Sequence, residues 1–193
     1  HTDARPPLPR PDNKAPDTKK RVKVFILLGQ SNMVGMGDLG PETNKGTLAF
    51  LTKKDGKYPW LIDDAGNWTE RKDVRNVRVM GSGTGGVKLF NNEWMTVKGR
   101  SIGPEFGIGH HIGHAIDAPV MILKSCIGNR SLGWDILPPG SPSYEYKMMD
   151  KKSKTEKTFV YAGYGQSPDR WEKGTEPKPI GWKAGVQYDG DVA

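Results

Sequence analysis

The chain has 193 residues and a formal net charge of +7, and its many glycines and prolines predict long loops. This length allows one domain with a hydrophobic core and excludes two large ones, and no apolar run is long enough to cross a membrane as a helix. A single cysteine, Cys126, excludes an internal disulfide and a cluster of thiolate metal ligands.

The N-terminal segment 1–18 is rich in Pro, Asp and Lys and has no hydrophobic periodicity. It predicts an arm, either extended along the surface or disordered, before a domain of residues 19–193. Basic blocks at 19–21 and 151–154 lack the interleaved aromatic residues that a surface for stacking nucleic-acid bases requires. We therefore interpret these blocks as solvated surface and expect no nucleic-acid partner.

Residues 22–28, 74–80 and 119–127 are the segments that predict β-strands. The first and the third are almost continuously apolar and are followed by a glycine, as is typical of parallel strands covered on both faces. A helix is predicted between the second and the third, over 104–116. This strand–helix–strand order favours an α/β fold with a parallel sheet.

The helix over 104–116 is predicted from its start and from its two side-chain stripes. Pro104 suits the first helical position, with Gly103 as the cap before it. Isoleucines recur every four residues and predict one apolar face. Gly109 and Gly113 form a stripe of small residues, which predicts a close approach to a neighbouring backbone.

The segments 37–73 and 138–193 are polar, rich in Gly and Pro, and carry scattered Trp and Tyr residues. Loops of this length are usually functional or disordered, and the aromatic residues argue against disorder. We interpret both as packed insertions around a site, with aromatic rings for stacking on sugars. Since three strands are visible and open sheets usually have about five, we expect the chain to hold only the N-terminal part of its fold.

Ser31 follows the first strand within a Gly-Gln-Ser-Asn-Met turn at 29–33. This position places its hydroxyl at the carboxyl edge of the sheet, where open α/β sheets bind their ligands. If a helix begins there, the backbone N–H groups of its first turn can hold an oxyanion. From position alone two interpretations stay open, because Ser31 is either a nucleophile or only the cap of that helix.

Three stretches together resemble one enzyme family. The pentapeptide 29–33, within residues 24–35, is similar to the first sequence block of the SGNH hydrolases. More narrowly, it resembles the carbohydrate esterase branch that contains sialate O-acetylesterases and acetyl xylan esterases. Residues 101–107 are similar to the glycine-proline-glutamate helix start of that branch, and residues 123–132 are similar to its second block.

The resemblance implies a three-layer α/β/α sandwich with a parallel sheet, as in flavodoxin-like folds. It implies a serine esterase that removes O-acetyl groups from carbohydrates, with Ser31 as the nucleophile and the N–H groups of Ser31 and Gly128 as the oxyanion hole. The branch usually has a second glycine where this chain has Asn129. The resemblance also implies no metal or organic cofactor and a secreted or periplasmic location.

Polar side chains beside Ser31 and Gly128 are candidates for contact with the acetylated carbohydrate. Those flanking the serine either position substrate or lock the turn through their own hydrogen bonds. Glu105 either contacts substrate or only complements the positive end of the helix dipole. The guanidinium of Arg130 suits a sugar or a carboxylate. The predicted substrate-binding residues are Gln30, Asn32, Glu105, Asn129, Arg130 and Ser131.

Two blocks of the branch have no counterpart in this chain. The third block carries a Trp-x-Gln-Gly-Glu-like segment that completes the oxyanion hole, and the last is Asp-x-x-His, which supplies the general base. None of the four histidines has an Asp three residues before it. A serine without a base is a poor nucleophile.

Three hypotheses account for the missing base. The chain is a fragment or cleavage product whose partner, a second chain, carries the Asp-x-x-His part. It is instead an inactive relative that binds carbohydrate or serves as an assembly subunit, or its base comes from an unexpected place. We favour the first hypothesis.

Two further patterns have weaker functional interpretations. His110 and His114 have a spacing that can hold zinc, but no neighbouring Glu or third ligand accompanies them, so we expect no metal site. The glycine-rich segment 81–86 fits a dinucleotide-binding fingerprint. Because residues 87–98 make a poor helix, we interpret it as a flexible loop.

Overall fold

The computed structural model describes residues 7–82 and 86–193. The chain divides into two compact units, each of which is described by itself. The first unit comprises the residues up to Val79 together with Leu89–Gly128, and the second comprises Met80–Lys88 and Asn129–Ala193. No helix in the described ranges has the length and apolar character needed to span a bilayer.

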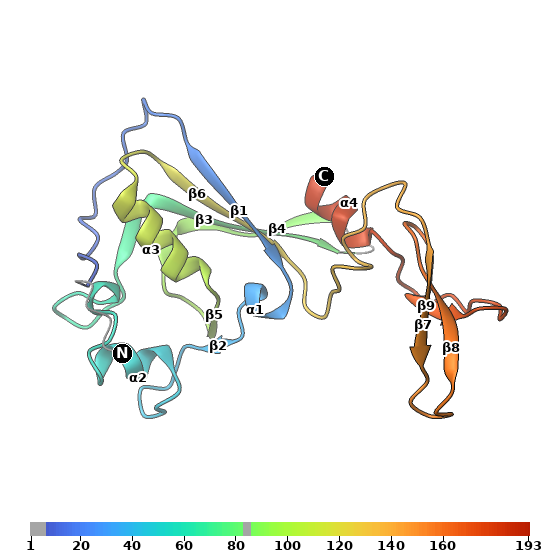
Figure 1. The fold of residues 1–193 in the computed structure, drawn as a ribbon. Helices are drawn as coiled ribbons and strands as arrows, with labels where there is room; N and C mark the ends of the chain where they lie inside the picture. Colours follow the sequence, from blue (N-terminus) through green and yellow to red (C-terminus); the bar gives the residue numbers. More distant parts are fainter. Residues whose placement is uncertain (1–6, 83–85) are drawn as a thin grey trace. The chain divides into compact units, whose positions relative to one another are not determined.

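The first unit contains most of the regular structure (Figure 1). Its elements in chain order are β1 (Lys23–Gly29), α1 (Ser31–Val34), β2 (Gly37–Asp38), α2 (Leu48–Lys53), the 3-10 helix η1 (Pro59–Leu61), β3 (Glu70–Ser82), β4 (Gly86–Thr96), β5 (Ser101–Ile102), α3 (Glu105–Ala115) and β6 (Val120–Cys126). The last residues of β3, from Met80, and the first residues of β4, up to Lys88, belong to the second unit. The three strands and the helix predicted from apolar runs are therefore present.

The main sheet has four strands in the order β1-β6-β3-β4. Both β1 and β3 run parallel to β6, as predicted, with Phe25 opposite Ile122 and Val74 opposite Val120. The prediction of a purely parallel sheet is wrong for β4, which returns from β3 as an antiparallel strand. Its direction is visible in the bonds from Arg75 to Asn92 and, at the far end of the pair, from the Thr96 hydroxyl to the Thr69 carbonyl.

In the glycine-rich segment 81–86, Gly81 and Ser82 end β3 and Gly86 begins β4, and residues 83–85, on which the predicted flexible loop falls, lie outside the described residues. The segment that follows it is strand β4 and not a helix. β4 is an outer strand of the sheet. The polar residues 91–93 interrupt its apolar residues, so no continuous apolar run predicted this strand.

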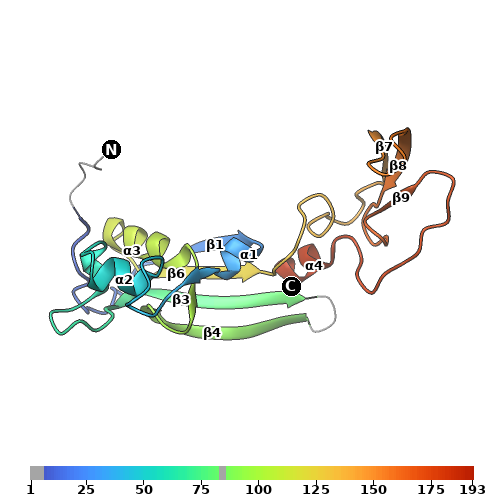
Figure 2. The same cartoon turned by 90° about the horizontal axis from the view of Figure 1, so that it is seen from below.

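One face of the sheet carries the core of the first unit. Phe25 and Leu27 of β1 point to this face, where α3 packs along the strands (Figure 2). Residues from the insertion 37–73 complete the same core, so this insertion is ordered around α3. The buried members of the cluster are Leu48, Leu61, Val74, Met95, Val97, Phe106, Val120 and Ile122.

The other face of β1 is apolar and open to solvent. Val24, Ile26 and Leu28 alternate with the core residues and are 51%, 61% and 46% exposed. The predicted sandwich with helices on both faces is thus not found in the described part of the first unit, where α3 covers one face. The structure supports a mixed α/β fold with a mixed sheet.

The start of helix α3 lies one residue beyond its predicted start. Pro104 takes the cap position with a φ of −69°, and Glu105 is the first helical residue. The two glycines lie against β3 and β4, but side chains approach them rather than the backbone that was predicted. A Cβ on Gly109 would lie 2.7 Å from the side chain of Met95, and one on Gly113 would lie 2.6 Å from the side chains of both Arg71 and Val74.

The second unit consists of the three-stranded antiparallel sheet β7-β8-β9 and one helix. Its elements are β7 (Tyr144–Met149), β8 (Glu156–Tyr161), β9 (Arg170–Glu172) and α4 (Val186–Val192). Tyr144 stacks on Tyr161 across the first pair of strands with ring centroids 5.1 Å apart. Charged side chains alternate with these rings, which is why the strands of segment 138–193 were not predicted.

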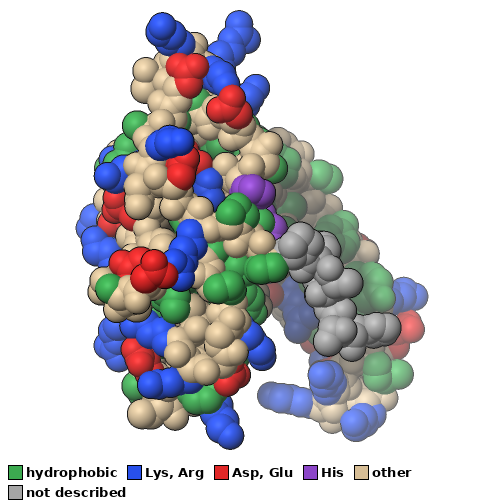
Figure 3. Space-filling view, turned by 90° about the vertical axis from the view of Figure 1, so that its left-hand side faces the viewer, with side chains coloured by type: hydrophobic (Ala, Val, Ile, Leu, Met, Phe, Trp, Pro, Cys, Tyr) green, Lys and Arg blue, Asp and Glu red, His purple; other side chains and the backbone are tan. Residues whose placement is uncertain are grey.

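The described part of the N-terminal arm, residues 7–18, contains no helix or strand. Arg10 forms an ion pair with Asp64, and Lys20, just after the arm, contacts Asp117. On the face shown in Figure 3, Lys and Arg side chains are interspersed with Asp and Glu.

The glycines of α3 provide a matched test of this packing. A Cβ on Gly107 would meet no atom within 4 Å, so Gly107→Ala should raise the free energy of unfolding by about 0.5–1 kcal/mol through helix propensity. Gly113→Ala gains the same propensity but must displace Arg71 and Val74, and we expect a net loss of about 1–3 kcal/mol. Urea unfolding measures both, and equal stabilities would contradict the packing of α3 on β3.

Candidate active site

Ser31 and Gly128 follow two neighbouring parallel strands at the same edge of the sheet. The register pairs Gly29, the last residue of β1, with Cys126, the last residue of β6. Ser31 and Gly128 each lie two residues beyond this pair. Helix α1, which begins at Ser31, lies at the carboxyl end of β1 (Figure 1). The structure therefore brings the predicted nucleophile and the predicted oxyanion residue to adjacent strand ends.

The hydroxyl of Ser31 is not used as a helix cap. The cap position of α1 belongs to Gln30, which makes no capping bond with its side chain. Ser31 is the first helical residue, is only partly buried, and donates its hydroxyl hydrogen to Oε1 of Gln30 over 3.1 Å. The interpretation of Ser31 as only a cap is therefore wrong. Gln30 and Asn32 are both exposed, and the bond between the side chains of Ser31 and Gln30 joins two neighbouring residues.

Glycines allow the turn that carries Ser31 to close tightly. A Cβ on Gly29 would lie 2.8 Å from the Cβ of Met33, so a larger residue there would push α1 off the strand. Gly35 ends α1 with a φ of +115°, a conformation that favours glycine. It is buried, and a Cβ on it would lie 3.0–3.1 Å from the backbone of Ile102 and Gly103.

A buried ion pair holds the other end of α1. Nζ of Lys124 lies 2.8 Å from Oε2 of Glu105, and the two side chains are 3% and 7% exposed. The same Nζ donates a hydrogen bond to the carbonyl oxygen of Val34 over 3.0 Å. Strand β6, the first residue of α3 and the last residue of α1 are thus joined at one ammonium group.

This pairing answers the question left open for Glu105. Its carboxylate points into the interior toward Lys124 and is not available at the surface for a substrate. Lys124 itself was not predicted, because it lies in an otherwise apolar strand. The signal that could have found it is a charge at an inward position of β6 together with an acidic residue at the start of the helix that covers it.

Gly128 and Asn129 lie at the surface, two and three residues beyond the end of strand β6. Both are exposed, and Asn129 has a φ of +58°, in the left-handed region. Asparagine tolerates this region better than other residues with a Cβ. Asn129 can therefore hold a backbone conformation suited to the glycine that the esterase branch usually has there.

Arg130 and Ser131 belong to the second unit, where both serve a buried carboxylate. Asp135 is 2% exposed, accepts a hydrogen bond of 2.6 Å from the N–H of Ser131, and lies 3.6 Å from Nη1 of Arg130. The indole N–H of Trp182 also donates to Asp135, and the guanidinium of Arg130 stacks over the Trp182 ring at 3.6 Å. Their interactions within this unit give Arg130 and the Ser131 amide a structural role.

The described histidines all lie on α3, and none of them bonds to Ser31. His110 is 1% exposed, and burial, assisted by the positive charge of Arg71, lowers its pKa to about 4. His111 and His114 are exposed. Among the described residues, no group of three or more His, Cys, Asp or Glu side chains is arranged to hold a metal ion.

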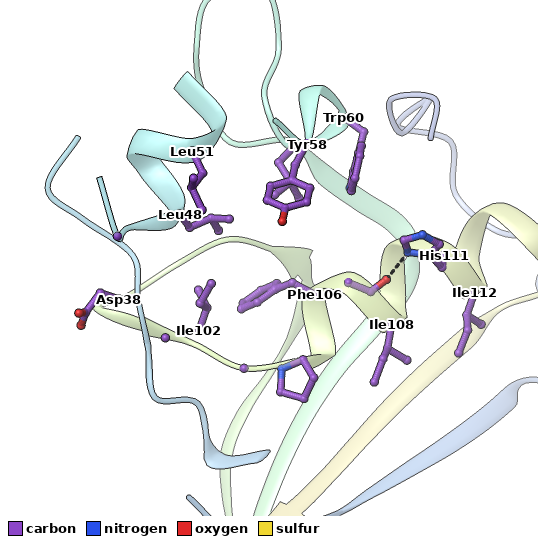
Figure 4. Close-up of a pocket in the computed structure, with 16 residues that line it drawn as sticks. Asp38, Leu48, Leu51, Tyr58, Trp60, Ile102, Phe106, Ile108, His111 and Ile112 are labelled. Carbon is purple, nitrogen blue, oxygen red and sulfur yellow. Dashed lines mark hydrogen bonds between the residues drawn. The ribbon is translucent and has the colours of Figure 1, made fainter. Parts of the chain in front are cut away.

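An apolar cavity of about 810 Å³ lies between α3 and the insertion that contains α2 and η1 (Figure 4). Leu48 and Leu51 border it from α2, and Tyr58 and Trp60 border it from the segment around η1. Phe106 and His111 lie on the α3 side. Ser31 does not line this cavity, so it is separate from the serine turn.

Comparisons with known proteins give no match for this chain. No protein-family model matches it, and no curated protein or solved structure is significantly similar to it. The likeness to SGNH hydrolases therefore depends on the motifs at 29–33, 101–107 and 123–132.

A double-mutant cycle tests the buried ion pair. Lys124→Met leaves the carboxylate of Glu105 buried without its partner, and we expect it to lower the free energy of unfolding by about 3 kcal/mol. Lys124→Met combined with Glu105→Leu removes both charges and should recover at least half of that loss. Urea unfolding of the single and double variants gives the coupling energy. Additive losses would contradict the pairing.

The buried histidine predicts a dependence of stability on pH. Since the folded-state pKa of His110 is about 4 and that of an unfolded histidine is about 6.5, only the unfolded chain takes up this proton between those values. The free energy of unfolding should therefore fall by about 2–3 kcal/mol as the pH decreases through this window. Urea unfolding at pH 7 and pH 4.5 should show a smaller difference in the free energy of unfolding for His110→Leu than for the wild type. His114→Leu, at an exposed position, should keep the wild-type difference.

Proposed function

We propose that this chain carries the nucleophile of an SGNH-type serine esterase that removes O-acetyl groups from carbohydrates. The observation that carries the proposal is the position of Ser31 and Gly128, two residues past paired ends of adjacent parallel strands. Ser31 begins a helix without capping it, its hydroxyl donates to Gln30, and Lys124 holds the last carbonyl group of that helix. This arrangement is the one expected of a positioned nucleophile.

In the proposed reaction, Oγ of Ser31 attacks the acetyl carbonyl carbon, and the N–H groups of Ser31 and Gly128 stabilise the oxyanion. The sugar hydroxyl leaves with a proton, and an acetyl ester remains on Ser31. Water then attacks this ester, releases acetate and restores the serine. The residues require no metal or organic cofactor for these steps.

The proton of the Ser31 hydroxyl must pass to a base during the attack. Within the described residues, its hydrogen-bond acceptor is the amide oxygen of Gln30, which is no general base. The ammonium group of Lys124 contacts Glu105 and the carbonyl oxygen of Val34, and no hydrogen bond among the described residues joins it to Ser31. We propose that the base comes from an Asp-x-x-His segment on a partner chain.

The surface of β1 supports such a partner. Val24, Ile26 and Leu28 form an exposed apolar row, and within the described sheet β1 pairs only with β6. An open strand edge beside an apolar face is a template for pairing and for burial of a further element. A segment that covered this face would lie close to the strand end that precedes Ser31. The family likeness adds a secreted or periplasmic location to the proposal.

The second candidate function is a non-catalytic carbohydrate-binding or assembly subunit that keeps the esterase scaffold. The absence of a base beside Ser31 among the described residues favours it. In that case the hydroxyl of Ser31 would have no role in chemistry, and the apolar row on β1 would serve assembly alone.

Labelling with a fluorophosphonate probe separates the two functions. The native preparation, with any partner chain present, should be labelled at Ser31 and should release acetate from acetylated xylan or acetylated sialic acid. Ser31→Ala should abolish the labelling and lower kcat at least about 10³-fold.

Ser143→Ala, at an exposed position in the second unit, is the matched control and should keep both signals. Intact-mass analysis of the same preparation shows whether a partner is present. A preparation that contains the partner and still fails to label would support the binding subunit.

A further inference from the structure

The apolar cavity beside α3 is built from aromatic rings on both of its sides (Figure 4). Tyr58 and Trp60 meet edge to face with centroids 5.4 Å apart and planes at 76°. Trp60 also meets the ring of His111 at 6.2 Å and 84°. Phe106 lies across from Trp60, on the α3 side. Rings so arranged present both edges and faces to an occupant, which favours an aromatic one.

Backbone geometry holds one of these rings in an unusual place. Tyr58 has a φ of +57° and a ψ of +52°, in the left-handed region that few residues with a Cβ adopt. It is the cap residue of η1, directly before Pro59. This conformation turns the chain so that Tyr58 and Trp60 both line the cavity.

Polar side chains are few around the cavity. Asp38 lies at one end and His111 at the other, and the hydroxyl group of Tyr58 points into the space between them (Figure 4). Nδ1 of His111 lies 2.8 Å from the carbonyl oxygen of Gly107, which can only accept, so Nδ1 carries the hydrogen in the neutral ring. Nε2 is then an acceptor with no partner among the described residues, and it suits a ligand that donates one hydrogen bond.

The same lining argues against a sugar. A sugar would bury several hydroxyl groups among mostly aliphatic and aromatic side chains that offer them too few hydrogen bonds, which is costly. We therefore infer that the ring of Trp60 contacts a ligand other than a carbohydrate at this cavity. An aromatic ring with a single hydroxyl group matches both the apolar walls and the acceptor on His111, which lies beside the ring of Trp60.

We propose that this cavity binds a small aryl alcohol of the phenol class. Its ring lies among Tyr58, Trp60 and Phe106, and its hydroxyl donates to Nε2 of His111. The site is separate from the serine turn, and its binding does not depend on Ser31. The proposal can therefore fail while the esterase function stands, and the reverse is equally true.

Titration with four small probes tests the ligand class by calorimetry and by chemical-shift changes. For 4-methylphenol we expect a Kd on the order of 1 mM, as its size allows. Toluene, which lacks the hydroxyl, should bind about three- to tenfold more weakly because the hydrogen bond is lost. 4-Methylcyclohexanol, which lacks the aromatic ring, should also bind more weakly. Methyl glucoside should not bind.

Gly107→Leu is the decisive variant, because it removes none of the proposed contacts. Gly107 lines the cavity, and a Cβ on it would meet nothing within 4 Å, so a leucine can extend into the open space without strain. It should fold at least as stably as the wild type and lower the affinity for 4-methylphenol at least tenfold. His111→Phe keeps a ring but removes the acceptor, and it should weaken 4-methylphenol binding three- to tenfold with no change for toluene.

Trp171→Ala, in the second unit, is the control and should bind all probes as the wild type does. Equal binding of 4-methylphenol by Gly107→Leu would overturn the proposal, because the ligand would then lie elsewhere. Absence of binding by the wild-type chain would also overturn it. Tighter binding of methyl glucoside than of 4-methylphenol would contradict the proposal and would favour a carbohydrate ligand for this cavity.

Discussion

Lys124 and Glu105 bring two opposite charges into the interior of the first unit, and the position of the serine turn depends on them. The ammonium group of Lys124 contacts the first residue of α3 and the last carbonyl of α1, while its own backbone belongs to β6. Burying such a pair gains little stability over an apolar substitute, because both charges lose their water. Its effect in this protein is geometric, since one short α-helix is fixed against two longer elements at a single point.

The remaining constraints act around the same junction. Gly35 and Gly103 allow two backbone segments to approach each other beside the ammonium group, and a Cβ on Gly103 would lie 2.4 Å from Glu105. At the opposite end of α1, the hydroxyl of Ser31 donates to the side chain of Gln30. The last residue of the helix is thus held, while its first residue is only partly buried. A positioned serine of this kind is what the proposed nucleophilic role of Ser31 requires.

Apolar runs and helix-start residues were sufficient to predict β1, β6 and α3, because the two strands are almost continuously apolar and the helix has a clear start. The same approach missed β4 and β7 to β9, because charged and polar residues interrupt the apolar residues of these strands. At the site, the sequence motifs predicted that Ser31 and Gly128 lie at the same edge of the sheet. The partners of Glu105 and Arg130 could not be predicted, because Lys124 and Trp182 meet them only in the folded chain. The apolar row on β1 was predicted as buried and is exposed here, which is where a covering segment is expected.

The most direct test of the account is a crystal structure of the native protein, with its partner, after reaction with a fluorophosphonate. The account predicts a covalent bond from Oγ of Ser31 to phosphorus. The phosphoryl oxygen should accept hydrogen bonds from the N–H groups of Ser31 and Gly128. An adduct on another residue would contradict the central claim, as would a phosphoryl oxygen turned away from the amide of Gly128.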